Sequence, residues 1–164
     1  MDATDSRQLL LQAAQGRRIS PPALQAAIAA LERQPAGQPP PLEGEWRSVW
    51  TSGTARAQRL GLPAQWLASC IRQRFDTAQH WLETELSWGA GYLRASGPFE
   101  LAARQRIQFA FAQLQLKLGP LPPIRVPLGQ RARGWLHTTY RDAQVHIERG
   151  DRGGVAVFVR EASP

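Results

Sequence analysis

Hydrophobic positions recur with helical spacing only at the start of the chain. One apolar stripe runs from Leu9 to Ala14, and Gly16 follows it at a position typical of a helix end. A second stripe begins after Ser20, a suitable capping residue followed by two prolines that fit a first helical turn. Because both stripes are narrow and rich in alanine, they predict two short helices that pack against a larger body. The second stripe consists of Leu24, Ala27, Ile28 and Leu31.

From Leu42 onward the apolar positions alternate with polar ones, which is the pattern of β-strands. Trp46, Ser48 and Trp50 fall on one side of the first predicted strand. Further strands are expected around 71–75, 80–88, 89–98 and 107–118. Residues 134–161 are expected to form two or three short strands joined by tight turns, with GDRGG as the turn before VAVFVRE. The proline-rich segment 119–129 is either a loop or an edge strand, because proline cannot donate to a central ladder.

The stretch RQRIQFAFAQLQLKLG changes parity along its length. Ile107, Phe109 and Phe111 point to one side of an extended chain, whereas Leu114 and the leucines after it point to the other. No strand keeps one buried face through such a switch. We therefore predict a bulge or a sharp bend between Phe111 and Leu114.

The pattern yields roughly seven to nine short strands, mostly in neighbouring order, with no helix long enough for a parallel crossover. The expected fold class is mainly β, and an antiparallel up-and-down barrel removes exposed edges most simply. A β-sandwich is the alternative. We expect residues 1–38 to form a helical extension with a proline-rich spacer and residues 42–161 to form the barrel domain.

Composition excludes several classes of function. The apolar content of 43% is ordinary for a globular domain, and no apolar run approaches the ~20 residues that cross a bilayer. Cys70 is the sole cysteine and the three histidines are scattered, so neither a metal site nor a cofactor is expected. The acidic N-terminal residues resemble neither a signal nor a transit peptide, which predicts a cytoplasmic location.

The formal net charge of +7 favours anionic partners. The basic residues are dispersed, so we expect peripheral attachment to an anionic membrane surface and no specific nucleic acid. GxSxG, GxGxxG and Walker motifs are absent from the sequence, and no enzyme is predicted.

Two stretches carry a resemblance to a known family. LEGEWRSVWTSGT resembles the opening strand of the plastid lipid-associated proteins, also called fibrillins or plastoglobulins. GWLHTTYRDAQVHIERGDRGGVAVFVRE is similar to that family's closing hairpin, and the likeness extends in order through most of the chain. The resemblance implies a cyanobacterial-type member of this family with a lipocalin-like barrel. Such a protein is expected to bind or carry a prenyl quinone, carotenoid or lipid at thylakoid membranes or lipid particles.

Three positions depart from the family pattern. His137 stands where the family has aspartate, Arg141 where it has an apolar residue, and His146 where it has arginine. Two histidines in place of an acid and a base would give hydrogen bonding a pH dependence that relatives lack.

The expected site is an apolar pocket with a few polar groups. Thr138, Tyr140 and Asp142 are two residues apart on an extended chain and are expected to share its inner side. A structural role for Tyr140 and Asp142, which ties neighbouring strands together, is the alternative. The candidate ligand-binding residues are Trp46, Trp50, Phe109, Phe111, Trp135, His137, Tyr140, Asp142 and His146.

Two other functions fit the same sequence. The first is an interaction protein whose barrel is filled and whose N-terminal helices dock a protein partner. The second is a lipocalin-like bilin lyase, although no motif in the chain requires it.

Overall fold

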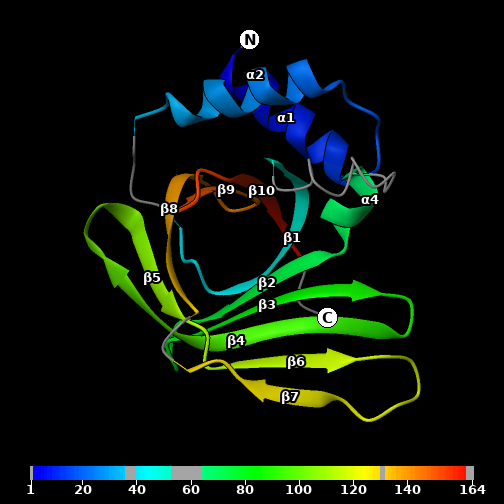
Figure 1. The fold of residues 1–164 in the computed structure, drawn as a ribbon. Helices are drawn as coiled ribbons and strands as arrows, with labels where there is room; N and C mark the ends of the chain where they lie inside the picture. Colours follow the sequence, from blue (N-terminus) through cyan, green and yellow to red (C-terminus); the bar gives the residue numbers. More distant parts are fainter. Residues whose placement is uncertain (1, 36–39, 53–63, 130–131, 162–164) are drawn as a thin grey trace.

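The computed structural model describes residues 2–35, 40–52, 64–129 and 132–161. These residues form a mainly β fold with two N-terminal helices above a barrel, as the sequence predicts (Figure 1). The helices are α1 (Ala3–Ala14), α2 (Pro21–Glu32), the short α4 (Ala64–Ser69) and the 3-10 turn η2 (Ala103–Gln105). The strands are β1 (Gly44–Thr51), β2 (Ile71–Asp76), β3 (Trp81–Trp88), β4 (Gly91–Ala102), β5 (Arg106–Ala110), β6 (Gln113–Lys117), β7 (Ile124–Pro127), β8 (Arg133–Arg141), β9 (Val145–Gly150) and β10 (Val155–Arg160).

Eight strands close into an antiparallel barrel. Their hydrogen-bonded order is β3-β2-β1-β10-β9-β8-β5-β4, and pairing of β4 with β3 completes the ring. The closed ring excludes the β-sandwich. The remaining two strands, β6 and β7, extend the β4 side of the sheet away from the barrel, so the described chain has ten strands where seven to nine were expected.

The predicted break after Phe111 is confirmed. Phe99 pairs with Phe109 and Ser96 pairs with Gln113, so three steps along β4 match four along the partner strand. The chain crosses closely over Gly97, where an added Cβ would lie 2.1 Å from the carbonyl oxygen of Ala110. This bulge lets β5 pair with β8 inside the barrel, while β6 leaves the barrel and pairs with β7.

The two helices cover the outer face of β1, β9 and β10. Leu10, Ile28 and Leu31 pack with Ile147 and Val157 in one buried cluster. These strands are therefore buried on both faces, which explains why 155–159 reads as the continuous apolar run VAVFV. Ser20 occupies the N-cap of α2, but its side chain makes no capping hydrogen bond, contrary to its expected role.

Ion pairs attach each helix to the barrel. The Arg7 side chain of α1 lies 2.6 Å from Asp142, and Arg149 of β9 lies 2.7 Å from Glu32 of α2. Thr139 also donates to Glu32, with an oxygen–oxygen distance of 2.8 Å. The helices and the barrel thus share both a core and a polar boundary, and the division into residues 1–38 and 42–161 stays a prediction.

Candidate ligand-binding site in the barrel

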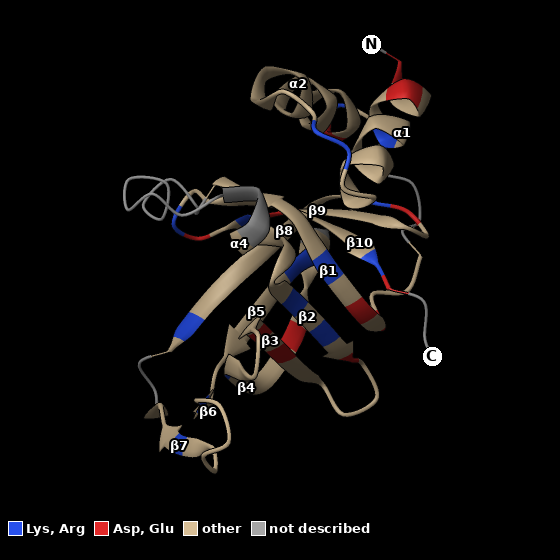
Figure 2. Cartoon of the chain, turned by 90° about the vertical axis from the view of Figure 1, so that its right-hand side faces the viewer, with Lys and Arg blue, Asp and Glu red and all other residues tan. Residues whose placement is uncertain are grey.

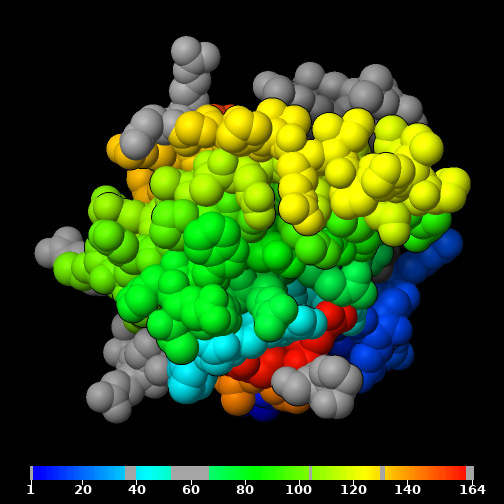
Figure 3. All heavy atoms as spheres, turned by 90° about the horizontal axis from the view of Figure 1, so that it is seen from below, coloured from blue at the N-terminus to red at the C-terminus, as the bar shows by residue number. Residues whose placement is uncertain are grey.

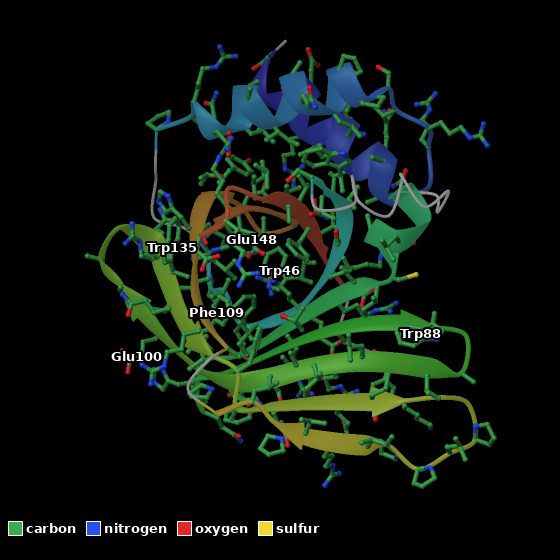
Figure 4. The ribbon with its side chains drawn as sticks, viewed as in Figure 1. Trp46, Trp88, Glu100, Phe109, Trp135 and Glu148 are labelled. Atoms are coloured by element: carbon green, nitrogen blue, oxygen red, sulfur yellow. The ribbon has the colours of Figure 1, made fainter. Side chains whose placement is uncertain are left out.

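The register of the strands identifies the side chains that face the barrel interior. Trp46 pairs with Gln73 and Ser48 with Phe158, while His146 also pairs with Phe158. Since directly opposed residues point to the same side of a sheet, these five side chains share the interior. Figure 4 shows Trp46 and Glu148 within the ring of strands and Trp135 toward its outer side.

One end of the interior is filled by aromatic side chains. Trp46, Phe75 and Phe158 surround His146, with ring centroids 5.2, 6.4 and 6.1 Å from the imidazole. Trp46 donates from Nε1 to the carbonyl oxygen of Leu42 at 2.9 Å, and the Arg160 guanidinium lies 4.2 Å from the Trp46 ring centroid. This end is closed and fully packed.

A layer of polar side chains lies above the aromatic floor. Gln73 Nε2 donates to Glu148 Oε1 at 2.9 Å, and Thr138 Oγ1 lies 3.2 Å from His146 Nε2. All of them are buried. We call this set the polar layer, and its members are Ser48, Gln73, Thr138, His146 and Glu148.

The polar layer has unused hydrogen-bonding capacity. Four of its atoms find no partner among the described residues: Ser48 Oγ, Gln73 Oε1, His146 Nδ1 and Glu148 Oε2. A buried polar atom left unpaired costs about 1–3 kcal/mol, so four in one layer require an explanation. Such atoms are the groups that would orient a bound molecule.

The end opposite the aromatic floor is lined by small or aliphatic side chains. Thr51 pairs with Ala156 and Gly150 with Leu136, and Ile71 continues the inner face of β2. All five are partly exposed. We call these five residues the cup; they follow the polar layer along the inner faces of their strands, and Ile71, Leu136 and Ala156 pack against the inner cluster.

The nine predicted site residues divide between the two sides of the barrel wall. Trp46 and His146 lie inside, and Phe109 and Phe111 pack against the inner cluster with ring centroids 4.7 Å apart. The other five are Trp50, Trp135, His137, Tyr140 and Asp142, and they lie on the outer side.

Two bulges account for part of this division. The register shifts between Ser48 and Trp50, so Trp50 pairs with the outward Val157 and packs beside α2. It lines an outer groove of about 280 Å³ with Ile28 and Val155. A second shift between Thr138 and Tyr140 turns Tyr140 outward, so the expectation that Thr138, Tyr140 and Asp142 share one side is wrong.

Strand alternation alone places Trp135 and His137 outside, next to Leu136 and Thr138 on the inside. The Arg106 guanidinium lies 4.6 Å from the Trp135 ring centroid on this outer surface. His137 pairs with Arg149 on the side of the barrel that faces α2.

Tyr140 and Asp142 form a hydrogen-bonded group with Arg7 of α1. Tyr140 donates to Asp142 Oδ2 at 2.9 Å, and Arg7 donates to the same oxygen at 2.6 Å. Burial and this hydrogen bond raise the pKa of Tyr140 to about 12. Burial also opposes ionisation of Asp142, but the amides of Gln144 and Val145, with Arg7 and Tyr140, outweigh it and lower its pKa. These contacts give both residues a structural role in this fold.

Comparison with known proteins agrees with this architecture. The PAP_fibrillin family model matches residues 11–159, which is most of the chain. The chain belongs to the PAP/fibrillin family. No solved structure gives a significant match to it.

Curated proteins match the chain over short segments. The chain is 43% identical over 60 residues to probable plastid-lipid-associated protein 3 of Oryza sativa subsp. japonica, covering 35% of this chain and 16% of that protein. It is 37% identical over 59 residues to a light-induced protein of Solanum tuberosum, covering 35% and 18%. It is 46% identical over 44 residues to the chromoplast-specific carotenoid-associated protein C1 of an Oncidium hybrid cultivar, covering 26% and 14%. The matched segments thus span less than a fifth of these relatives.

The PAP/fibrillin chain carries two uncommon protonation states in its polar layer. Burial, reinforced by the charges of Arg141 and Arg160, lowers the pKa of His146 to about 3. Burial raises the pKa of Glu148 to about 7, although the hydrogen bond from Gln73 opposes this. The 3.9 Å separation of His146 Nε2 and Glu148 Oε2 would permit an ion pair. Because desolvation disfavours both charges and two arginines oppose a protonated imidazole, the neutral pair prevails between about pH 3 and pH 7.

Opposing titrations are expected to flatten the pH dependence of stability. The lowered pKa of His146 makes stability rise with pH between about 3 and 6.5, whereas the raised pKa of Glu148 makes stability fall between about 4.5 and 7. Replacing Glu148 by glutamine leaves only the His146 contribution. Relative to the wild type, the variant should gain unfolding free energy with pH between 4.5 and 7, at up to about 1.4 kcal/mol per pH unit.

Urea denaturation of both proteins at a series of pH values measures this difference. Asp142 and Glu32, whose pKa values are also lowered, titrate equally in both proteins and cancel. A difference that does not change between pH 4.5 and 7 would show that Glu148 is ionised in the barrel.

Gln73, Glu148 and Ser48 are the polar-layer residues that sequence reasoning missed. Strand alternation could have identified them. Gln73 lies between Ile71 and Phe75 on one alternating face, and Glu148 is two residues after His146. A polar residue at an inward position of an otherwise apolar face marks an interior polar group.

Proposed function

We propose that this PAP/fibrillin protein binds, without catalysis, one hydrophobic small molecule that has a polar end group. The polar end reaches the polar layer and the apolar part fills the cup. The four unpartnered buried atoms of the polar layer are the observation that carries this proposal. The apolar walls of the cup favour the rest of such a molecule by about 25 cal/mol per Å² of buried surface.

The chemistry of the polar layer favours a carbonyl-bearing ligand. A neutral Glu148 carboxyl donates a hydrogen bond, which an ionised carboxylate cannot do. Ser48 Oγ of β1, separated from β9 by β10, offers a second donor. Among prenyl quinones, carotenoids and lipids, a prenyl quinone matches these donors better than a hydrocarbon carotenoid does.

The setting we propose is the surface of photosynthetic membranes or lipid particles. Two relatives carry lipid- or carotenoid-associated in their names, which supports such a setting. Within the described part of the chain, the helices are too short or too polar to cross a bilayer. The net charge of +7 supports peripheral contact with anionic lipid.

A pair of identical substitutions tests the position of the site. Ala156 lines the cup, whereas Ala29 lines the outer groove beside Trp50. Titration with decylplastoquinone, followed by tryptophan quenching, should give one saturable site in the wild type. Replacing Ala156 by tryptophan should weaken binding by about tenfold because the new side chain occupies the cup, and the same replacement at Ala29 should leave binding unchanged.

Two results would contradict the proposal. One is the absence of saturable binding by the wild type, which would favour an interaction protein with a filled barrel. The other is loss of binding in the Ala29 variant alone, which would move the site to the outer groove.

A further inference from the structure

Exposed apolar side chains gather on the hairpin formed by β6 and β7. Five large hydrophobic residues are exposed among the described residues, and four of them lie between positions 118 and 126. These four are exposed by 46–61%. We call residues 113–127 the β6–β7 hairpin, and its exposed apolar residues are Leu118, Leu121, Ile124 and Val126.

The hairpin projects from the barrel. β6 pairs with β4 on one side and β7 on the other, while β7 is the last strand of the sheet (Figure 1). Seen from below, the hairpin occupies a broad part of the surface (Figure 3). Its apolar residues are therefore available to a large, flat partner.

Prolines make this edge a poor site for strand addition by another protein. Pro122 and Pro123 precede β7 and Pro127 ends it, and none of them has an amide hydrogen to donate. Another protein therefore cannot readily add a strand at this edge and cover the exposed apolar residues. A fluid lipid surface needs no such pairing.

The hairpin has one apolar and one basic face. Leu116 pairs with Ile124 and Leu114 with Val126, which places these side chains on the same face. The opposite face carries Arg125, opposed by Gln115, and Lys117 by alternation. Segments with one apolar face and long basic side chains on the other face bind in the membrane interface.

The sequence that contains the hairpin carries only positive charge. Residues 101–141 contain seven lysines and arginines and no acidic residue, so this stretch accounts for the whole net charge of +7. Figure 2 shows basic but no acidic residues on β6 and β7. The acidic side chains nearest in the sheet, Glu83 and Glu85 of β3, are paired with Arg94. Such a surface complements anionic headgroups.

We propose that the β6–β7 hairpin docks the protein onto an anionic lipid surface. Leu118, Leu121, Ile124 and Val126 enter the boundary between headgroups and acyl chains, and Lys117 and Arg125 contact lipid phosphates. Neither group alone gives firm attachment, since apolar burial and charge attraction add in interfacial binding.

Docking in this way would bring a continuous apolar face to the lipid. One row of directly paired residues runs from the hairpin across β4 and β3 to the cup: Ile124, Leu116, Leu93, Leu86 and Ile71. A hydrophobic molecule that leaves the lipid would follow this row into the barrel. Docking rests on the membrane setting proposed above and assigns it a surface, whereas entry of a ligand into the barrel rests on the proposed binding function.

Vesicle flotation tests the docking surface. Vesicles of equal parts phosphatidylglycerol and phosphatidylcholine should bind the wild type, and raised salt should weaken binding. Replacing both Leu121 and Ile124 by serine should lower the partition coefficient by at least about tenfold, because two exposed apolar side chains no longer enter the lipid. Replacing Lys117 and Arg125 by glutamine should reduce binding to anionic vesicles but not to pure phosphatidylcholine.

Leu101 supplies the matched control. It is 57% exposed, close to the 61% of Leu121, but it lies at the other end of β4. Leu101→Ser should bind vesicles like the wild type. Equal binding by the wild type and the Leu121/Ile124 variant, or equal loss in the Leu101 variant, would overturn the proposal. Decylplastoquinone titration without vesicles distinguishes loss of lipid docking from loss of quinone binding in the cup. The hairpin variants should keep the wild-type affinity for the quinone.

Discussion

Replacing Gln73 and Glu148 together by methionine is expected to leave the protein at least as stable as the wild type while impairing its function. Methionine preserves the volume of both side chains. Because both partners of the 2.9 Å hydrogen bond are removed, neither a donor nor an acceptor is left unpaired. Their two unpartnered oxygens also disappear. The affinity for decylplastoquinone should nevertheless fall by about thirtyfold or more, because the main polar contacts to the ligand are lost.

The combination of unchanged stability and lost affinity distinguishes a binding site from a structural network. The matched control is the double replacement of Glu32 and Arg149 by methionine, which removes a hydrogen-bonded pair on the outer side of the barrel. That control should keep the quinone affinity. A Gln73/Glu148 variant with lower stability and normal affinity would make the polar layer a structural feature only.

Replacing Trp46 by alanine is expected to lower the free energy of unfolding by about 3–5 kcal/mol. Trp46 is fully buried and contacts His146 at the aromatic floor. Its removal leaves a cavity and deprives the Leu42 carbonyl of its hydrogen-bond donor. Urea denaturation measures the loss. A variant whose free energy of unfolding falls below zero would show no cooperative transition.

Trp88 provides the comparison for this substitution. It lies at the end of β3 and is partly exposed (Figure 4). Its replacement by alanine should cost only about 1 kcal/mol. Equal losses for the two tryptophans would mean that the aromatic floor is not the packed centre of the barrel.

The fold was largely predictable because its elements follow simple periodicities. The helical stripes before residue 34, the alternation from Leu42 and the parity switch after Phe111 all correspond to observed elements. The excursion of β6 and β7 was not predictable from pattern, since it depends on the close crossing at Gly97 and on which strand pairs with β8. Such pairing is a long-range property.

The site was only partly predictable because parity arguments fail at bulges. One extra residue at each of two positions turned Trp50 and Tyr140 to the outer face, and no residue type in either strand marks these shifts. Trp135 and His137 were assigned by likeness and chemistry, which do not define a face. His146, noted in the sequence as a departure from the family pattern, lies in the interior, and its role in ligand binding stays a prediction. Glu148, 3.9 Å from it, was not among the candidate residues.

Photolabelling with an azido-substituted prenyl quinone tests most directly whether the barrel interior holds the ligand. A site in the cup predicts labelled peptides from β2 and β9, which carry Gln73 and Glu148. An excess of unlabelled decylplastoquinone should abolish the label. Labelling confined to the peptides of α2, around Ile28, or to the β6–β7 hairpin would contradict ligand binding inside the barrel.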